Sequence, residues 1–269
     1  DFFLGAALHM ITGKSDYTFD FFQEDTEDYY SVYPGNYHSY WLNQYITSTF
    51  SGVQLKVGTL FLLTPELRIG IAADLPFSLH VNEEYGSSDE IEFDDGTVSE
   101  AYLSDGAWEY LVTYPARFNA GIALDTKQLL VTGSVTYTDW SGTEFGIPDG
   151  LAITEDYESL LAENTFFRQD YTSQLSYSGG AELRLPGTGL SIRGGYRYEP
   201  SPLASGEGEF DREYISGGIG YRLDRNTTLN AAYTVGKWQS QGYDSLTPAG
   251  TRETVETTRI SLGLSFRFE

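Results

Sequence analysis

The sequence of 269 residues contains no cysteine, three histidines, and only 16 lysine and arginine residues against 39 aspartates and glutamates. The lack of cysteine excludes a disulfide framework. No stretch of 18 apolar residues occurs, which excludes a transmembrane helix. The net charge of -23 argues against nucleic acid as a partner. What the chain has in quantity is aromatic residues, at 15% of the sequence, and 29 glycines.

The end of the chain, residues 257–268, alternates apolar and polar side chains without a break. Ile260, Leu262 and Leu264 fall in one phase, while Arg259 and Ser261 fall in the other. Because a strand has a side-chain period of two, this segment presents one apolar and one polar face. A closed barrel satisfies its own backbone groups and can therefore cross lipid with such strands. The pattern predicts an all-β, transmembrane antiparallel β-barrel.

Alternation and turn residues together predict ten strand-forming spans in one unit, residues 1–269. The spans lie near residues 2–12, 44–63, 67–80, 105–124, 129–140, 166–185, 190–198, 214–223, 228–238 and 255–268. In the third span, the alternate residues from Leu67 to Leu79 are expected to share one face. Connections alternate strictly between short and long, as in outer-membrane barrels with short periplasmic turns and long outer loops. A soluble β-sandwich is not expected to keep that order.

Five long segments, mostly loops, hold 31 of the 39 acidic residues, while the spans between them carry arginine. Acidic loops fit simple solubility, or bridging by divalent cations at a lipopolysaccharide surface, and both interpretations stay open. The acidic run at residues 89–96 does not match the register of a calcium loop, so no metal site is predicted.

The three histidines, His9, His38 and His80, give little support to the hypothesis that the chain is an enzyme. Only His80 lies near the end of a span beside acids, Glu83 and Glu84, which is a common coincidence in so acidic a loop. No nucleophile elbow, zinc-protease helix or phosphate-binding glycine loop is present. We predict no enzyme activity and no cofactor.

From residue 108 onward, an ordered series of segments resembles the FadL family of outer-membrane transporters of long-chain fatty acids and hydrocarbons. The segments are Tyr114–Leu124, Val135–Ser141, Gly179–Leu185, Ile192–Pro202 and Ile215–Leu223. The resemblance implies an outer-membrane location in a Gram-negative-type bacterium and passive diffusion of hydrophobic compounds. Other barrels fit the pattern too: a general or polar-solute porin, a rim enzyme, or a structural or adhesive barrel.

The chain departs from the family in its N-terminal part. Family members have fourteen strands and an N-terminal plug with an Asn-Pro-Ala motif, whereas this sequence shows ten spans and no such motif. We expect the plug and the first strands to be absent and any export signal to lie outside these residues. A genuine ten-stranded barrel is also allowed.

By this correspondence, residues 13–42 and 82–100 are the two outer loops that form a capture groove in the family. Exposed apolar patches mark binding sites, and the first loop is dense in aromatics. The alternative is an interfacial girdle on a strand extended above the membrane. The candidate groove residues are Phe21, Phe22, Tyr29, Tyr30, Tyr33, Tyr40 and Trp41.

Five lumen-phase arginines could bind a carboxylate headgroup through paired hydrogen bonds, or could be neutralised by Asp74 and Glu182. They are Arg117, Arg184, Arg193, Arg197 and Arg222. Pro115 lies inside a predicted span, and because proline donates no backbone hydrogen bond it predicts a bulge, kink or local gap there. The expected partners are hydrophobic small molecules, membrane lipid and lipopolysaccharide, and divalent cations at the acidic loops.

Overall fold

The computed structural model describes residues 1–30, 36–205, 210–242 and 250–267. Within these ranges, thirteen strands form one antiparallel sheet, with two short helices in one connection. The strands are β1 (Phe2–Glu24), β2 (Tyr37–Leu62), β3 (Leu67–Asp74), β4 (Phe77–Phe93), β5 (Val98–Tyr114), β6 (Arg117–Asp125), β7 (Leu129–Asp139), β8 (Glu144–Gly146), β9 (Ser173–Arg184), β10 (Leu190–Glu199), β11 (Arg212–Arg222), β12 (Thr227–Gly242) and β13 (Thr251–Phe266).

Each of the ten predicted spans has its strand in the structure. The count rises to thirteen because two spans are each broken in two, giving β3 with β4 and β5 with β6, and because the short β8 follows β7. From β6 through β13, with β8 set aside, consecutive strands are neighbours; β3 adjoins β6, and β2 pairs with β1, β3 and β4. Within the described ranges, β1 and β13 are not bonded to each other, so the sheet is open.

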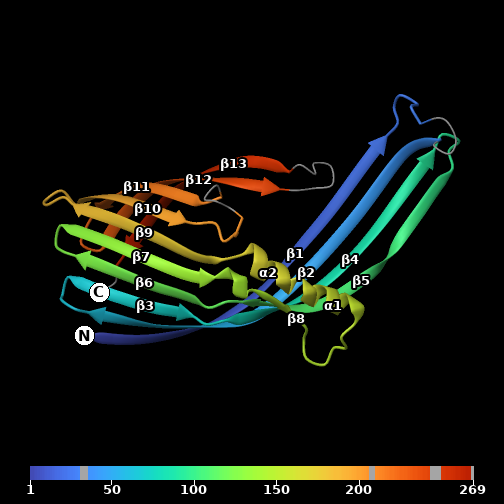
Figure 1. Ribbon diagram of the computed structural model, residues 1–269. Helices are drawn as coiled ribbons and strands as arrows, with labels where there is room; N and C mark the ends of the chain where they lie inside the picture. The colour runs from blue at the N-terminus through green and yellow to red at the C-terminus, as the bar shows by residue number, and fades with distance from the viewer. Residues whose placement is uncertain (31–35, 206–209, 243–249, 268–269) are drawn as a thin grey trace.

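The tight turns at one end of the sheet are closed by a side chain. Thr64 Oγ1 accepts from the Leu67 N–H at 3.0 Å, Thr126 Oγ1 from Leu129 at 3.0 Å, and Thr188 Oγ1 from Leu190 at 3.1 Å. Asp224 Oδ1 does the same for the Thr227 N–H at 2.8 Å. Such local hydrogen bonds favour turns over strand continuation. The four short connections expected from turn residues, at 64–66, 125–127, 186–189 and 224–226, are therefore present, and the N-terminus lies at the same end (Figure 1).

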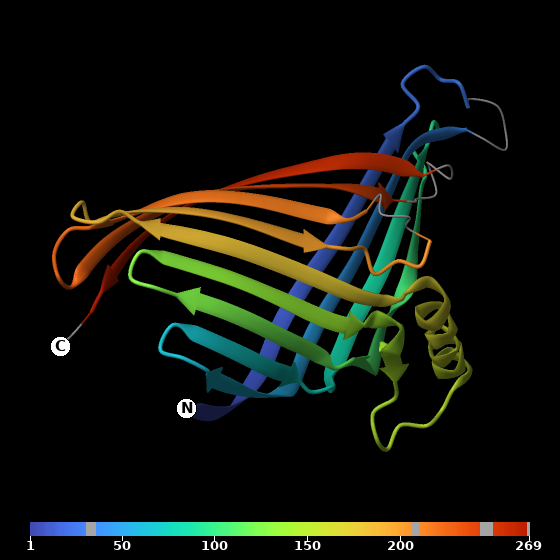
Figure 2. The same cartoon turned by 60° about the vertical axis from the view of Figure 1, so that its left-hand side comes forward.

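Apolar side chains lie on the surface of the sheet rather than in a core. Val81 is the one buried apolar side chain among the described residues, whereas Leu262 is 82% exposed and Ile260 is 72% exposed. A water-soluble protein buries such residues. The sheet is curved (Figure 2), and a curved sheet with an exposed apolar face fits a wall in contact with lipid.

Four strands are much longer than a membrane requires. β1 has 23 residues and β2 has 26, whereas β3 has 8 and β6 has 9. Figure 1 shows β1, β2, β4 and β5 continuing together well beyond the other strands. We call this part, residues 13–24, 37–51, 77–93 and 98–114, the extension, and the remaining strands the wall.

The wall meets the extension at two adjacent prolines. Pro76 separates β3 from β4, and Pro115 separates β5 from β6; both lack the N–H that a ladder needs. Relative to β2, the register shifts there by one residue, since Lys56 pairs with Asp74 but Gly52 pairs with Leu79.

This shift turns the side chains of the extension over. Ile69 and Ile71 face outward from the wall, whereas Phe77 and Leu79 face the side that continues the lumen. The prediction that Leu67 to Leu79 share one face is therefore wrong, because one extra residue reverses a period of two.

Most apolar side chains of the four extension strands lie on the lumen side, which we call the inner face, whereas Phe22 and Trp41 lie on the opposite face. β1 and β2 keep one register throughout, and their sequence itself changes phase. The inner face comprises Tyr17, Phe19 and Phe21 of β1; Tyr40, Leu42, Ile46 and Phe50 of β2; Phe77, Leu79, Val81 and Tyr85 of β4; and Trp108, Tyr110, Val112 and Tyr114 of β5.

The connection after β7 contains a 3-10 turn at Trp140–Gly142, the helix α1 at Glu155–Ala162 and the helix α2 at Asn164–Asp170. The predicted span at 166–185 thus begins too early, because its first residues belong to α2. In the described part of the chain, no helix is long and apolar enough to cross a membrane. Figure 1 places both helices beside β8, where the extension leaves the wall.

Candidate ligand-binding site

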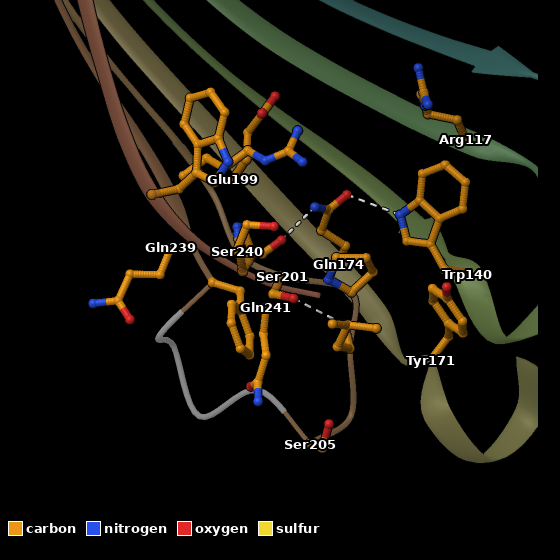
Figure 3. A pocket seen from close by; sticks show the side chains of 16 residues that line it. Arg117, Trp140, Tyr171, Gln174, Glu199, Ser201, Ser205, Gln239, Ser240 and Gln241 are labelled. Carbon is orange, nitrogen blue, oxygen red and sulfur yellow. Dashed lines mark hydrogen bonds between the residues drawn. The ribbon is translucent and has the colours of Figure 1, made fainter. Parts of the chain in front are cut away.

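A cavity of about 550 Å³ lies on the lumen side at the long-loop end of the wall. Arg117 of β6, Trp140 of the 3-10 turn, Tyr171 after α2 and Gln174 of β9 form one side, as Figure 3 shows. The other side comes from the ends of β10, β11 and β12 and from the loop between β10 and β11. Those residues are Glu199, Pro200, Ser201, Pro202, Leu203, Ser205, Phe210, Arg212, Trp238, Gln239, Ser240 and Gln241.

Gln174 joins the two sides of this cavity. Its amide oxygen accepts from Trp140 Nε1 at 3.0 Å, and its amide nitrogen donates to the carbonyl of Pro200 (Figure 3). One side chain therefore fixes both the indole ring and the chain segment opposite.

That segment, residues 200–204, lies along the chain just before β9. The Thr172 N–H donates to the Pro202 carbonyl at 2.8 Å, and the Ala204 N–H donates to the Asp170 carbonyl at 2.7 Å. On its other side, Asp211 accepts from the Ser201 N–H at 2.7 Å and from the Tyr198 hydroxyl. The loop after β10 is thereby held as a wall of the cavity.

Three arginines near the cavity differ in what surrounds them. Arg212 lies 5.2 Å from the ring centre of Trp238, and Arg197 pairs with Glu199 and lies 5.9 Å from the ring centre of Tyr214. Arg117 is exposed and forms no side-chain hydrogen bond or ion pair with any described residue. Arg117 lies at the edge of the cavity.

Arg184 and Arg193 lie farther down the wall and are neutralised. Glu182 binds Arg184 at 2.7 Å and Arg193 at 2.5 Å, and Asp125 binds Arg184 at 2.8 Å. Arg222 is exposed at the short-turn end of β11. Arg117 therefore lines the cavity, and Arg197 pairs with Glu199, which also lines it. Arg184, Arg193 and Arg222 do not line the cavity.

The predicted groove aromatics divide between two faces of the extension. Phe21 and Tyr40 lie on the inner face, with ring centres 6.3 Å apart. Phe22 and Trp41 are direct partners across β1 and β2 and point to the opposite face. Tyr33 lies outside the described residues.

Tyr29 and Tyr30 occupy the tip between β1 and β2. Asp25 holds them there, since its carboxylate accepts from the Tyr29 N–H at 2.9 Å and the Tyr30 N–H at 2.7 Å. The hydrogen bond from Tyr30, chiefly, lowers the pKa of the Asp25 carboxyl below its ordinary value. The ring of Tyr30 also meets Tyr37, at 6.2 Å between centres.

Neither the alternation of side chains nor the turn residues point directly to most inner-face residues or to the cavity. Tyr17 is 56% exposed, Phe19 39%, Ile46 40% and Tyr85 44%, so the inner face is open in the described structure. The signal that could have found it is the polar phase opposite, Lys14, Asp16, Thr18 and Asp20 in β1, which marks that side as the solvent face.

His80 and the acidic loops form no metal-binding cluster in the part of the chain that the structure describes. His80 Nε2 lies 3.5 Å from Glu109 Oε2. No described cluster of three or more histidine and acidic side chains could hold a metal ion. Pro115 lies at the break between β5 and β6, beside Gly142 of the 3-10 turn.

The fold and cavity together define an outer-membrane β-barrel protein with a polar lumen side and an aromatic outer extension. The family described as Outer membrane protein transport protein (OMPP1/FadL/TodX) matches residues 42–268. The chain belongs to this family, so the resemblance to FadL proteins and the outer-membrane location are confirmed. It is a family of transport proteins rather than enzymes.

Two solved structures show the same fold at low sequence identity. The toluene transporter TbuX of Ralstonia pickettii is 16% identical, with a TM-score of 0.53, and the match covers 98% of this chain and 63% of TbuX. The toluene transporter TodX of Pseudomonas putida is 12% identical, with a TM-score of 0.50 and coverage of 98% and 70%. The chain thus spans less than two thirds of the length of TbuX. No curated protein sequence matches it.

Proposed function

We propose that this chain transports hydrophobic compounds, long-chain fatty acids among them, across the outer membrane by passive diffusion. The observation that carries the proposal is the reversal of the apolar face at Pro76 and Pro115. Below the prolines, apolar side chains face lipid; above them, they face the lumen side, where four are exposed and most of the others are half-buried. An open apolar surface above a lumen is suited to capture a ligand that water rejects.

The extension then faces the outside of the cell, with the short turns in the periplasm. Inner-face aromatics such as Phe21 and Tyr40 capture the ligand at the outer loops. The opposite face carries acids, including Asp16, Asp20 and Glu90, which contact solvent and the divalent cations of lipopolysaccharide.

A carboxylate ligand is favoured by the surroundings of Arg117. This side chain has no ion-pair partner among the described residues and lies beside Trp140 and Tyr171, so one site offers both a guanidinium and apolar rings. Guanidinium binds carboxylate through two parallel hydrogen bonds. TbuX and TodX are toluene transporters, and a neutral hydrocarbon would use the rings without the charge.

Passage of small polar solutes is a second candidate, favoured by the hydroxyl groups that line the wall below the cavity. Ser134 bonds Ser178 at 2.8 Å and Thr136 bonds Asn119 at 2.8 Å, beside a second cavity of about 370 Å³. A polar-solute channel needs no apolar surface above it, so the two candidates differ in their dependence on the inner face.

The test is uptake of a labelled long-chain fatty acid by cells that lack their own transporter and express the full chain. Phe21→Ser with Tyr40→Ser removes two inner-face rings, and Phe22→Ser with Trp41→Ser is the matched control on the opposite face of the same strands. We expect the inner pair alone to lower uptake severalfold. Equal uptake by both variants, or uptake of sugars but not of fatty acid, contradicts the proposal.

A further inference from the structure

A run of five aromatic rings connects the inner face of the extension with the cavity in the wall. It begins at Trp108 and Tyr110 of β5, whose ring centres are 6.1 Å apart. The next steps are Tyr110 to Phe145 at 5.8 Å, Phe145 to Phe167 at 5.3 Å, and Phe167 to Tyr171 at 5.7 Å. Tyr171 is itself a lining residue of the cavity.

The run comes from three separate elements that polar contacts hold in place. Asn164 binds the backbone of Phe145 twice, accepting from its N–H at 2.7 Å and donating to its carbonyl at 2.9 Å, which docks α2 on β8. The Tyr110 hydroxyl donates to Glu83 at 3.0 Å, and the Tyr157 hydroxyl donates to the Glu109 carbonyl at 2.8 Å. These bonds satisfy the polar groups beside the run and fix the positions of its rings.

The rings are not sealed as the core of a small loop domain would be. All five are half-buried, and neither α1 nor α2 has a buried residue. Rings in a sealed core would lose nearly all their exposure. Here each ring keeps an accessible surface, and neighbouring surfaces follow one another at contact distance.

We propose that this aromatic run is a binding path along which the apolar part of the ligand passes from the extension to the cavity. The proposal rests on the proposed transport function and adds the route between its two sites. A ligand that moves from ring to ring keeps part of its apolar surface out of water at each step. The run therefore accepts alkyl chains and aromatic rings and excludes polar solutes.

Phe167 is the residue to change, because its neighbour in sequence provides a matched control. Phe167 contacts two rings of the run, whereas Phe166 is 53% exposed and contacts none of them. Both belong to α2, so Phe167→Gln and Phe166→Gln alter the helix equally. Phe167→Leu keeps an apolar side chain at the same place.

The measurement is the rate at which a brominated long-chain fatty acid quenches Trp140 and Trp238 in the cavity. The parent chain for this experiment is the full chain with Trp41→Phe and Trp108→Phe, which keep an aromatic ring at both positions. Trp140 and Trp238 are then the only tryptophans left to fluoresce. We expect Phe167→Gln to slow quenching about tenfold, the factor that corresponds to losing one aromatic contact. Phe166→Gln and Phe167→Leu should remain close to the parent chain.

Two outcomes would overturn the path: an unchanged rate in folded Phe167→Gln, or equal slowing by Phe166→Gln or Phe167→Leu. If Phe167→Gln released α2 from β8, residues 147–154 would be cleaved faster by protease. In that case the quenching rate of Phe167→Leu is the one that tests the path. A failure of the proposed transport function would be distinguishable, because the parent chain itself would take up no fatty acid. Parent uptake that does not depend on Phe167 contradicts the path only.

Discussion

Asp74 of β3 and Arg117 of β6 are direct partners across the sheet at the point where both strands end, yet they form no ion pair. The buried Asp74 carboxylate binds Lys56 instead, at 3.2 Å, from the strand on its other side. Asp74 was the expected partner for a lumen arginine. Because Lys56 takes that role, Arg117 has no ion-pair partner at the cavity among the residues that the structure describes.

Replacing Arg117 with Gln should weaken binding of a long-chain fatty acid about 10- to 100-fold, the cost of one or two charge-assisted hydrogen bonds. Binding of the corresponding methyl ester should change little, because the ester carries no charge. Titration of the purified chain with both ligands checks this.

Arg222→Gln is the control for this change, because Arg222 is also exposed and in the lumen phase but lies at the other end of the wall. It should leave both affinities as they are. If the ester loses as much affinity as the acid in Arg117→Gln, the guanidinium is not a headgroup site.

Glu182→Gln should destabilise the wall by roughly 2 kcal/mol, since it leaves two arginines without their shared carboxylate in a partly buried place. The Glu182 side chain is 13% exposed and contacts both Arg184 and Arg193. Glu256→Gln breaks a pair with Lys237 in which both side chains are about two-thirds exposed, and should cost less than about 1 kcal/mol. The midpoints of thermal unfolding of the two variants are compared by gel mobility. Equal midpoints would contradict a larger stabilisation by Glu182.

The sequence predicts the strands far better than it predicts which way their side chains point. Alternation and turn residues identify all ten spans and the four short turns, because both signals are local. The alternation from Leu67 to Leu79 continues unbroken in the sequence, while the backbone gains one residue against β2 near Pro76. A register shift is a relationship between two strands, and one strand's sequence does not contain it.

The candidate site shows the same limit. Arg117 can be identified from its phase, but whether it is paired depends on Lys56, sixty-one residues away. Gln174 and Trp140 carry no local signal, since their roles come from the packing of the loop after β10 against β9. The number of aromatic residues in the first loop also does not show that they lie on two opposite faces of the strands.

The tip that carries Tyr29 and Tyr30 should loosen at low pH. Hydrogen bonding lowers the pKa of Asp25 in the folded chain below its ordinary value of 3.8. A lowered pKa means that the carboxylate stabilises the tip above about pH 4 and that this contribution is lost as the pH falls through the folded-state value. Proteolysis of the tip should therefore accelerate only in strong acid.

Asp25→Asn should make the tip sensitive to protease already at pH 7, because a neutral amide accepts these bonds more weakly. Asp28→Asn is the control in the same turn; its φ of 51° is one that asparagine tolerates. The rates of cleavage at the tip are compared at each pH over the same digestion time, with a protease that is active in acid for the low-pH samples. Similar cleavage of both variants would show that Asp25 does not hold the tip.

The reversal of the apolar face can be tested directly, because the chain contains no cysteine of its own. Single cysteines at Ile71 and Leu79 carry a spin label, and collision with oxygen, which concentrates in lipid, is compared with collision with a water-soluble nickel complex. We expect the label at residue 71 to meet lipid and the label at residue 79 to meet none, because the shift near Pro76 places the two on opposite sides. An uninterrupted strand would give both labels the same face, with residue 79 pointing outward like residue 71. Matching lipid contact at both positions would therefore remove the inner face on which the capture surface depends.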